Sequence, residues 1–188
     1  MATPFQKQKL IYFFHILDLN NNGSVQLDDF LEMVEKVCKM MGYEAGSKEE
    51  KRITNKAIRF FNALVRDIEP LDPRQISEEE WVAFFDEEVQ QREDMLVEYK
   101  EIVFNFMFDF FDHNHDGYIS RKEYEDFYQI FGIDKRALDE AFPKLISGNE
   151  NKLHRYDLMD AVEDFFTSDS KEVAGNWVFG NWENPPRA

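Results

Sequence analysis

Oxygen-bearing residues recur at regular positions in the run DHNHDGYISRKE, which spans residues 112–123. At positions one, three, five and twelve of the run stand Asp112, Asn114, Asp116 and Glu123. Ca²⁺ takes roughly six to eight hard oxygen ligands, and a twelve-residue loop can supply them from positions one, three, five, seven, nine and twelve. The Tyr118 carbonyl would serve at position seven, and Glu123 would give both carboxylate oxygens. The run is therefore a candidate calcium-binding loop, here named loop three.

The remaining positions of loop three complete the pattern of an EF-hand loop, D-x-[DN]-x-[DN]-G-x5-E. Gly117 stands at position six, where the sharp turn favours a residue without a Cβ. Ser120 at position nine offers a hydroxyl or holds a bridging water. His113 and His115 fall on even positions and are expected to face solvent, since no Cys or third His completes a tetrahedral zinc site.

A second loop with the same spacing, loop one, spans residues 18–29 and reads DLNNNGSVQLDD. Its candidate ligands, including the carbonyl of the seventh-position serine, are Asp18, Asn20, Asn22, Ser24 and Asp29. Only Asp18 and Asp29 are anionic. The Asp29 side chain is one methylene shorter than Glu and reaches an ion through one oxygen, a geometry that favours six-fold coordination and Mg²⁺. We therefore expect loop one to bind calcium more weakly than loop three, with Mg²⁺ as a competitor.

EF-hands bury their apolar faces in pairs, so each of these loops predicts a partner. Aligning the chain on the β-branched residue at position eight, Val25 or Ile119, identifies loop two at 69–80 and loop four at 146–157. In loop two, Leu71 and Pro73 replace ligands and Arg74 replaces the glycine, so it is expected to bind no metal. Loop four opens with Ile146 but keeps Glu150 and Asp157. Two calcium ions are expected per chain, and three if loop four binds.

Apolar periodicity predicts eight helices, at residues 4–17, 26–41, 48–67, 77–92, 94–111, 121–131, 134–146 and 155–167. Capping boxes are predicted at Ser47, Ser77 and Ser120. The expected fold is all-α: two pairs of EF-hand helix–loop–helix motifs in one compact unit, with short β bridges between paired loops. The predicted divisions are 1–92, 93–167 and an aromatic tail at 168–188 that packs on the body.

Composition narrows the possible functions. The 188 residues include 19 Phe and carry a net charge of −16, which predicts a substantial core and disfavours nucleic acid and anionic membranes as partners. One cysteine, Cys38, excludes an internal disulfide and suggests a reducing compartment. With no signal peptide or membrane span in the sequence, we expect a cytoplasmic monomer. No catalytic motif is present, so an enzyme is not expected.

The sequence resembles the sarcoplasmic calcium-binding protein family, including its calerythrin-like members. The resemblance rests on the two full loops, the degenerate loop two, the long first-half spacing and the ending GNWVFG at 175–180. It implies that the tail tucks into an apolar cavity of the protein itself. The departure lies in loop four, because calerythrin-like proteins tend to keep a working fourth site and Ile146 opposes one here.

Two functions are consistent with these features, with a third alternative. A calcium buffer would open little on binding, whereas a sensor would expose an apolar groove to a protein target. Sensor grooves are rich in methionine, and 7 Met against 19 Phe, together with the aromatic tail, favour the buffer. Coelenterazine photoproteins and luciferin-binding proteins share the four-hand fold, but the four His residues do not form the His-Trp-Tyr sets that those sites use.

Overall fold

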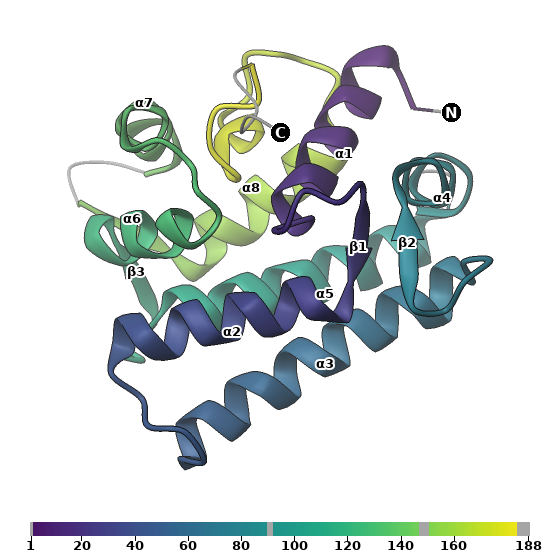
Figure 1. Cartoon of the computed structure of the whole chain (residues 1–188). Helices are drawn as coiled ribbons and strands as arrows, with labels where there is room; N and C mark the ends of the chain where they lie inside the picture. The colour runs from purple at the N-terminus through teal and green to yellow at the C-terminus, as the bar shows by residue number, and fades with distance from the viewer. Residues whose placement is uncertain (1, 90–91, 147–150, 184–188) are drawn as a thin grey trace.

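Eight α-helices and two short antiparallel strand pairs form the described part of the computed structural model, residues 2–89, 92–146 and 151–183 (Figure 1). In chain order the elements are α1 (Pro4–Leu17), β1 (Ser24–Gln26), α2 (Leu27–Met41), α3 (Lys48–Ile68), β2 (Gln75–Ser77), α4 (Glu78–Phe84), the π-helix η1 (Phe85–Val89), α5 (Glu93–Phe111), β3 (Tyr118–Ser120), α6 (Arg121–Ile130), α7 (Lys135–Leu145), β4 (Lys152–His154), α8 (Arg155–Thr167) and the 3₁₀-helix η2 (Ala174–Trp177). The predicted all-α class is confirmed.

The predicted helices are confirmed, with one change of geometry. The helix expected at 77–92 is α-helical to Phe84 and then passes into the π-helical turn η1; residues 90–91 lie outside the described part. A π-helical turn adds a residue to the helix and so rotates the faces that follow it. Here Phe85 and Asp86 are both buried, and the Asp86 carboxylate pairs with the Lys7 amine at 2.7 Å. The turn brings an acidic residue inward where a regular amphipathic helix was expected.

The strand pairs confirm the alignment on position eight. Val25 pairs with Ile76 between loops one and two, and Ile119 pairs with Leu153 between loops three and four. All four side chains are fully buried. Each bridge joins two loops back to back, so a loop that binds no metal still holds its partner's backbone in place.

Two of the three predicted capping boxes are confirmed. Ser77 and Ser120 each accept a hydrogen bond from the N3 backbone, and the Glu80 and Glu123 carboxylates each accept one from the cap N–H. At Ser47, only one of the two hydrogen bonds of the predicted capping box is present. Ser47 caps the Glu50 N–H, but the Glu50 carboxylate accepts from the Gly46 N–H at 3.3 Å instead. The Ser47 N–H already donates to the Glu44 carbonyl.

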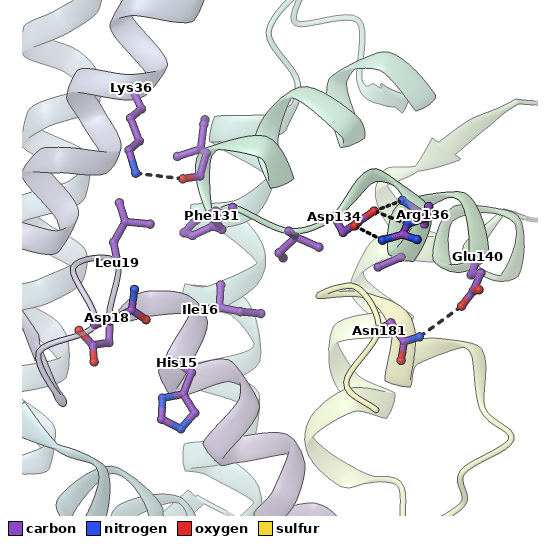
Figure 2. Close-up of a pocket in the computed structure, with 15 residues that line it drawn as sticks. His15, Ile16, Asp18, Leu19, Lys36, Phe131, Asp134, Arg136, Glu140 and Asn181 are labelled. Atoms are coloured by element: carbon purple, nitrogen blue, oxygen red, sulfur yellow. Dashed lines mark hydrogen bonds and ion pairs between the residues drawn. The ribbon is translucent and has the colours of Figure 1, made fainter. Parts of the chain in front are cut away.

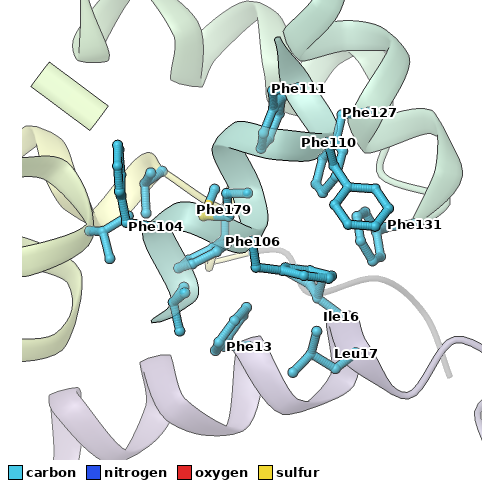
Figure 3. Packing of buried hydrophobic residues seen from close by; sticks show 14 of the residues in the cluster. Phe13, Ile16, Leu17, Phe104, Phe106, Phe110, Phe111, Phe127, Phe131 and Phe179 are labelled. Carbon is cyan, nitrogen blue, oxygen red and sulfur yellow. The ribbon is translucent and has the colours of Figure 1, made fainter. Parts of the chain in front are cut away.

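Phenylalanine rings join the two halves into one core (Figure 3). Phe106 of α5 stacks on Phe60 of α3 at 4.3 Å between ring centroids and contacts Phe30 of α2 edge-on at 6.1 Å. At the end of α5, Phe111 lies 3.8 Å from the ring of Phe127 in α6. Because α5 of the second half packs on α2 and α3 of the first, the two helix–loop–helix pairs form one compact unit. The division at residue 92 stays a prediction.

Residues 175–182 of the aromatic tail pack into the body (Figure 1). Val178, Phe179 and Trp182 are all buried, and Phe179 stacks on Phe13 of α1 at 4.2 Å. Cys38 is also buried and unpaired. Among the helices of the described ranges, none combines the length and the apolar character that a membrane span needs.

The buried amine of Lys9 ties α1 to the end of α8 and to the tail. It donates to the Ser168 carbonyl at 2.8 Å and to the Asn176 side-chain oxygen at 2.9 Å. The Lys9 side chain is fully buried, and burial lowers the pKa of its amine to about 8, against the raising effect of Asp164 and Asp169. Its three donors meet protein acceptors, because a longer bond at 3.4 Å reaches the Asp164 carbonyl.

This pKa makes stability rise with pH. Since the folded-state value of about 8 lies below the ordinary 10.5, the unfolded chain binds more protons between these values, and the free energy of unfolding increases across that window. We expect the protein to gain about 2 kcal/mol between pH 8 and pH 10 relative to a Lys9→Met variant. Urea titrations of both proteins at several pH values measure the gain. Parallel pH profiles for the two proteins would contradict it.

Candidate metal centres

Loops one and three share one backbone conformation. In both, the first residue ends the preceding helix with φ near −75°: −74° at Asp18 and −75° at Asp112. Position four is left-handed in both, with φ of 55° at Asn21 and 57° at His115. The position-six glycines, Gly23 and Gly117, both have φ of 84°. Glycine adopts this conformation without steric cost, which is why the pattern needs it there.

In loop three the side-chain oxygens are held by the loop's own N–H groups. The Asp112 carboxylate accepts from the N–H of Asp116 at 3.1 Å and of Gly117 at 3.0 Å. The Asn114 side-chain oxygen accepts from Asp116 N–H at 2.8 Å, and Asp116 accepts from Tyr118 N–H at 3.0 Å. Asp112 and Glu123 are buried, while Asn114 and Asp116 are exposed. These hydrogen bonds fold the loop into successive tight turns.

Loop one repeats this arrangement. The Asp18 carboxylate accepts from Asn22 N–H at 3.1 Å and Gly23 N–H at 2.8 Å, and the Asn22 side-chain oxygen accepts from Ser24 N–H at 3.0 Å. Asn20 and Asn22 are exposed, whereas Asp18 and Asp29 are buried. Burial raises the pKa of Asp29, although hydrogen bonds from the N–H groups of Gln26 and Asn20 oppose the shift. A buried carboxylate is costly to ionise alone, and a bound cation offsets that cost.

The position-twelve carboxylate makes the same pair of bonds in three loops. It accepts from the N–H groups at positions three and nine, through Asp29 in loop one (3.1 and 2.8 Å), Glu80 in loop two (2.9 and 2.9 Å) and Glu123 in loop three (3.4 and 2.9 Å). This carboxylate therefore closes each loop mechanically, whether or not the other positions carry ligands.

Loop two keeps that closure and departs elsewhere. Its left-handed residue is Glu69 at position one, with φ of 50°, so the chain enters the loop differently from loops one and three. Arg74 at position six pairs with the Asp72 carboxylate at 2.7 Å and holds the pKa of that carboxyl down at about 2. Leu71 at position three is fully exposed. Arg74 thus stands where loops one and three have the turn glycine, which is consistent with the prediction that this loop binds no metal.

Loop four is described only in part, because residues 147–150, including Glu150, lie outside the described ranges. Its strand β4 supplies a residue that sequence reasoning missed. The Lys152 amine lies 3.6 Å from the Asp116 carboxylate of loop three and over the Tyr118 ring. The sequence contained a signal for this contact. The position-eight alignment pairs Ile119 with Leu153, and this pairing places Lys152 beside loop three. The positive charge of Lys152 at that position opposes the binding of a metal cation in loop three.

The side chains as they lie do not form a closed ligand shell. Across the described residues, no three His, Cys, Asp or Glu side chains converge closely enough to hold an ion. Loop one has only two acidic candidates, and in loop three Asp116 points to the Asn114 amide at 3.1 Å and to Lys152. The loops thus present the backbone frame of a metal site, with oxygens that must turn toward a common centre.

One expectation for the histidines is wrong. His113 does not face solvent: its ring is half-buried against α2 and α3, beside Val37 and Arg52, and its Nε2 atom is buried without a hydrogen-bond partner. The packing of loop three on the first half overrides the rule for even positions; His115 is exposed as expected. The His15 ring lies 3.2 Å from the Glu78 carboxylate.

A groove of about 920 Å³ runs between loop one and the link from α6 to α7 (Figure 2). Its polar side chains are engaged with the protein itself. Arg136 pairs with Asp134 at 2.8 Å, the Asn181 amide donates to Glu140 at 3.2 Å, and the Lys36 amine donates to the Ile130 carbonyl at 3.3 Å. Asp18 lies in its wall, so the groove adjoins loop one. Its charged groups are satisfied internally and do not define a ligand.

Comparison with known proteins identifies the two loops that the spacing singled out. A family model described as "EF hand" matches residues 107–128, and one described as "EF-hand domain pair" matches residues 2–36. Calerythrin from Saccharopolyspora erythraea is 23% identical over 173 residues, covering 88% of this chain and 94% of calerythrin. Two segments of the chain thus match EF-hand models, and the chain is similar to calerythrin over most of its length.

Solved structures agree with this assignment at the level of fold. A sarcoplasmic calcium-binding protein from amphioxus superposes on this EF-hand protein with a TM-score of 0.77 at 20% identity, covering 96% of this chain and 99% of the other. The coelenterazine-binding protein from Renilla muelleri, in a calcium-loaded apo form, gives a TM-score of 0.73 at 18% identity, with 96% and 99% covered. The family resemblance inferred from the sequence is confirmed.

Proposed function

We propose that this EF-hand protein is a calcium buffer that binds one ion in loop three and one in loop one. The ligands in loop three are the side chains of Asp112, Asn114, Asp116 and Glu123 and the Tyr118 carbonyl; those in loop one are the side chains of Asp18, Asn20, Asn22 and Asp29 and the Ser24 carbonyl. Two ions change the net charge from −16 to −12. The calcium-binding relatives and the shared backbone of the two loops support this assignment.

Buffering is favoured by one observation: the tail fills the space that a sensor would open to a target. Val178, Phe179 and Trp182 are buried against the body. Among the described residues, large apolar side chains that are exposed are few: Leu31 and Met40 on α2, Leu71 in loop two, Val97 on α5 and Tyr156 on α8. A sensor displays a contiguous apolar groove when calcium binds, and such a groove is rich in methionine. The single buried Cys38 fits a reducing compartment, so we place the buffer in the cytoplasm.

A calorimetric calcium titration, combined with an apolar fluorescent dye, tests the proposal. We expect two ions per chain and little change in dye fluorescence on adding calcium. A sharp calcium-dependent rise in dye binding would instead show a sensor. Coelenterazine added to the same samples tests the function for which the Renilla protein is named. We expect no binding, because Phe179 already occupies the interior against Phe13 and Phe165, at 4.2 and 4.6 Å.

Magnesium should compete at loop one and hardly at loop three. The shorter Asp29 side chain gives one oxygen and suits the octahedral shell of Mg²⁺, whereas Glu123 can give two oxygens to the larger ion. An Asp29→Glu variant should therefore gain about tenfold in calcium affinity at loop one and lose its sensitivity to Mg²⁺. Calorimetry with and without Mg²⁺ measures both effects, and Glu123→Asp provides the converse variant. A loop one that is indifferent to Mg²⁺ in the unmodified protein would contradict the expectation.

A further inference from the structure

The segment 174–182, here named the strap, is held by buried side chains from two different hands. Three consecutive carbonyls of the strap each accept a hydrogen bond from a tyrosine hydroxyl. Tyr124 of α6 donates to Trp177 at 3.2 Å, Tyr128 of α6 donates to Val178, and Tyr12 of α1 donates to Phe179 at 2.8 Å. All three tyrosines are buried.

The strap also lies directly on α8. A Cβ added at Gly175 would come within 2.3 Å of the Asp164 Cβ and 2.5 Å of the Ala161 carbonyl, so only glycine fits there. The fully buried Asn176 side chain accepts from the Lys9 amine of α1. Farther along, Trp182 packs edge-on against Phe5 of α1, with ring centroids 4.8 Å apart. The strap is thus fixed at three places: α1, α6 and α8.

These attachment points lie on helices that flank the two candidate metal loops. Tyr124 directly follows Glu123, the position-twelve residue of loop three, and Tyr128 lies one turn later in the same helix. Tyr12 belongs to α1, the helix that leads into Asp18 at position one of loop one. A cation that drew the Glu123 carboxylate inward would move the start of α6, and the hydroxyls of Tyr124 and Tyr128 would move with it.

A shift of α6 relative to α1 cannot be absorbed freely. A buried carbonyl left without its donor costs free energy, so the strap favours arrangements in which all three tyrosine bonds persist. The strap joins the helix after loop three to the helix before loop one, so a change of state in one loop would bias the other. Such coupling is reciprocal for binding free energies.

We propose that the strap couples the two calcium loops, so that an ion in either one changes the affinity of the other while the interior stays covered. This inference rests on calcium binding at loops one and three. The tyrosine hydroxyls of Tyr12, Tyr124 and Tyr128 are its positioning groups; they touch no ion.

The test measures calcium affinity at loop three with loop one intact or disabled by Asp18→Asn and Asp29→Asn. Terbium luminescence sensitised by Tyr118 reports on loop three, and calcium competes for that site. When the strap is unmodified, we expect the calcium affinity of loop three to differ at least about fivefold between the protein with loop one intact and the protein with loop one disabled. In a Tyr12→Phe/Tyr128→Phe variant, which keeps both rings and removes one strap bond on each helix, the ratio should fall below about twofold.

Tyr99→Phe is the matched control, because Tyr99 is equally buried but donates to Asp67 at 2.8 Å, away from the strap. Circular dichroism verifies the fold, and the single variant Tyr124→Phe replaces the double variant if that one unfolds. The strap proposal is overturned if the unmodified chain shows no coupling, if the double variant keeps the coupling, or if Tyr99→Phe abolishes it equally. Failure of both loops to bind calcium would instead refute the proposed function.

Discussion

Replacing Glu123 with Gln should lower the calcium affinity of loop three by about 100-fold or more. The amide keeps the length of the side chain but loses the charge and one of the two oxygens that a larger ion uses at position twelve. Glu123 also closes the loop, because its carboxylate accepts from the N–H groups of Asn114 at 3.4 Å and Ser120 at 2.9 Å. Calcium titration by calorimetry, with terbium luminescence from Tyr118, measures the loss.

Loop two supplies the matched control for this substitution. Glu80 makes equivalent bonds to the N–H groups of Leu71 and Ser77, both at 2.9 Å, in a loop that is expected to bind no metal. Glu80→Gln should therefore destabilise its loop in a similar way and leave the calcium affinity unchanged. If the two substitutions affect calcium binding equally, the role of Glu123 is closure of the loop alone. An unchanged affinity in Glu123→Gln would remove Glu123 from the ligand set.

The largest expected loss of stability follows from replacing Phe111 with Ala. This ring is fully buried at the end of α5, 3.8 Å from Phe127 and 5.4 Å from Tyr128 between ring centroids, so it fixes the helix entering loop three against the helix leaving it. Truncating a buried phenylalanine leaves a cavity and costs about 3–5 kcal/mol in free energy of unfolding. Urea denaturation of the metal-free protein measures the change.

Tyr156→Ala serves as the control, since this aromatic residue is 72% exposed. An exposed side chain without a special role should change the free energy of unfolding by about 0.5 kcal/mol or less. A similar small change for Phe111→Ala would show that the interior at the end of α5 repacks around the missing ring. The contacts of Phe111 would then contribute less to holding loop three than its burial indicates.

The sequence by itself predicted the fold class, the eight helices and both strand pairs. These features depend on local patterns: apolar periodicity defines the helix faces, and the turn glycines Gly23 and Gly117 define where the loops bend. The register of each strand pair followed from a single position. The apolar residue at position eight of one loop pairs with the position-eight residue of the partner loop. The pairs Val25 with Ile76 and Ile119 with Leu153 therefore follow from loop spacing alone.

Only the tertiary structure decided what surrounds those loops. The half-buried ring of His113 and the approach of Lys152 to Asp116 depend on contacts between distant segments, which local periodicity does not encode. The same holds for the three tyrosine hydroxyls on the tail, because their partners lie 50 or more residues away in the chain. Loop chemistry is local and can be read from spacing; the coupling between loops depends on packing, and packing is settled only when the whole chain folds.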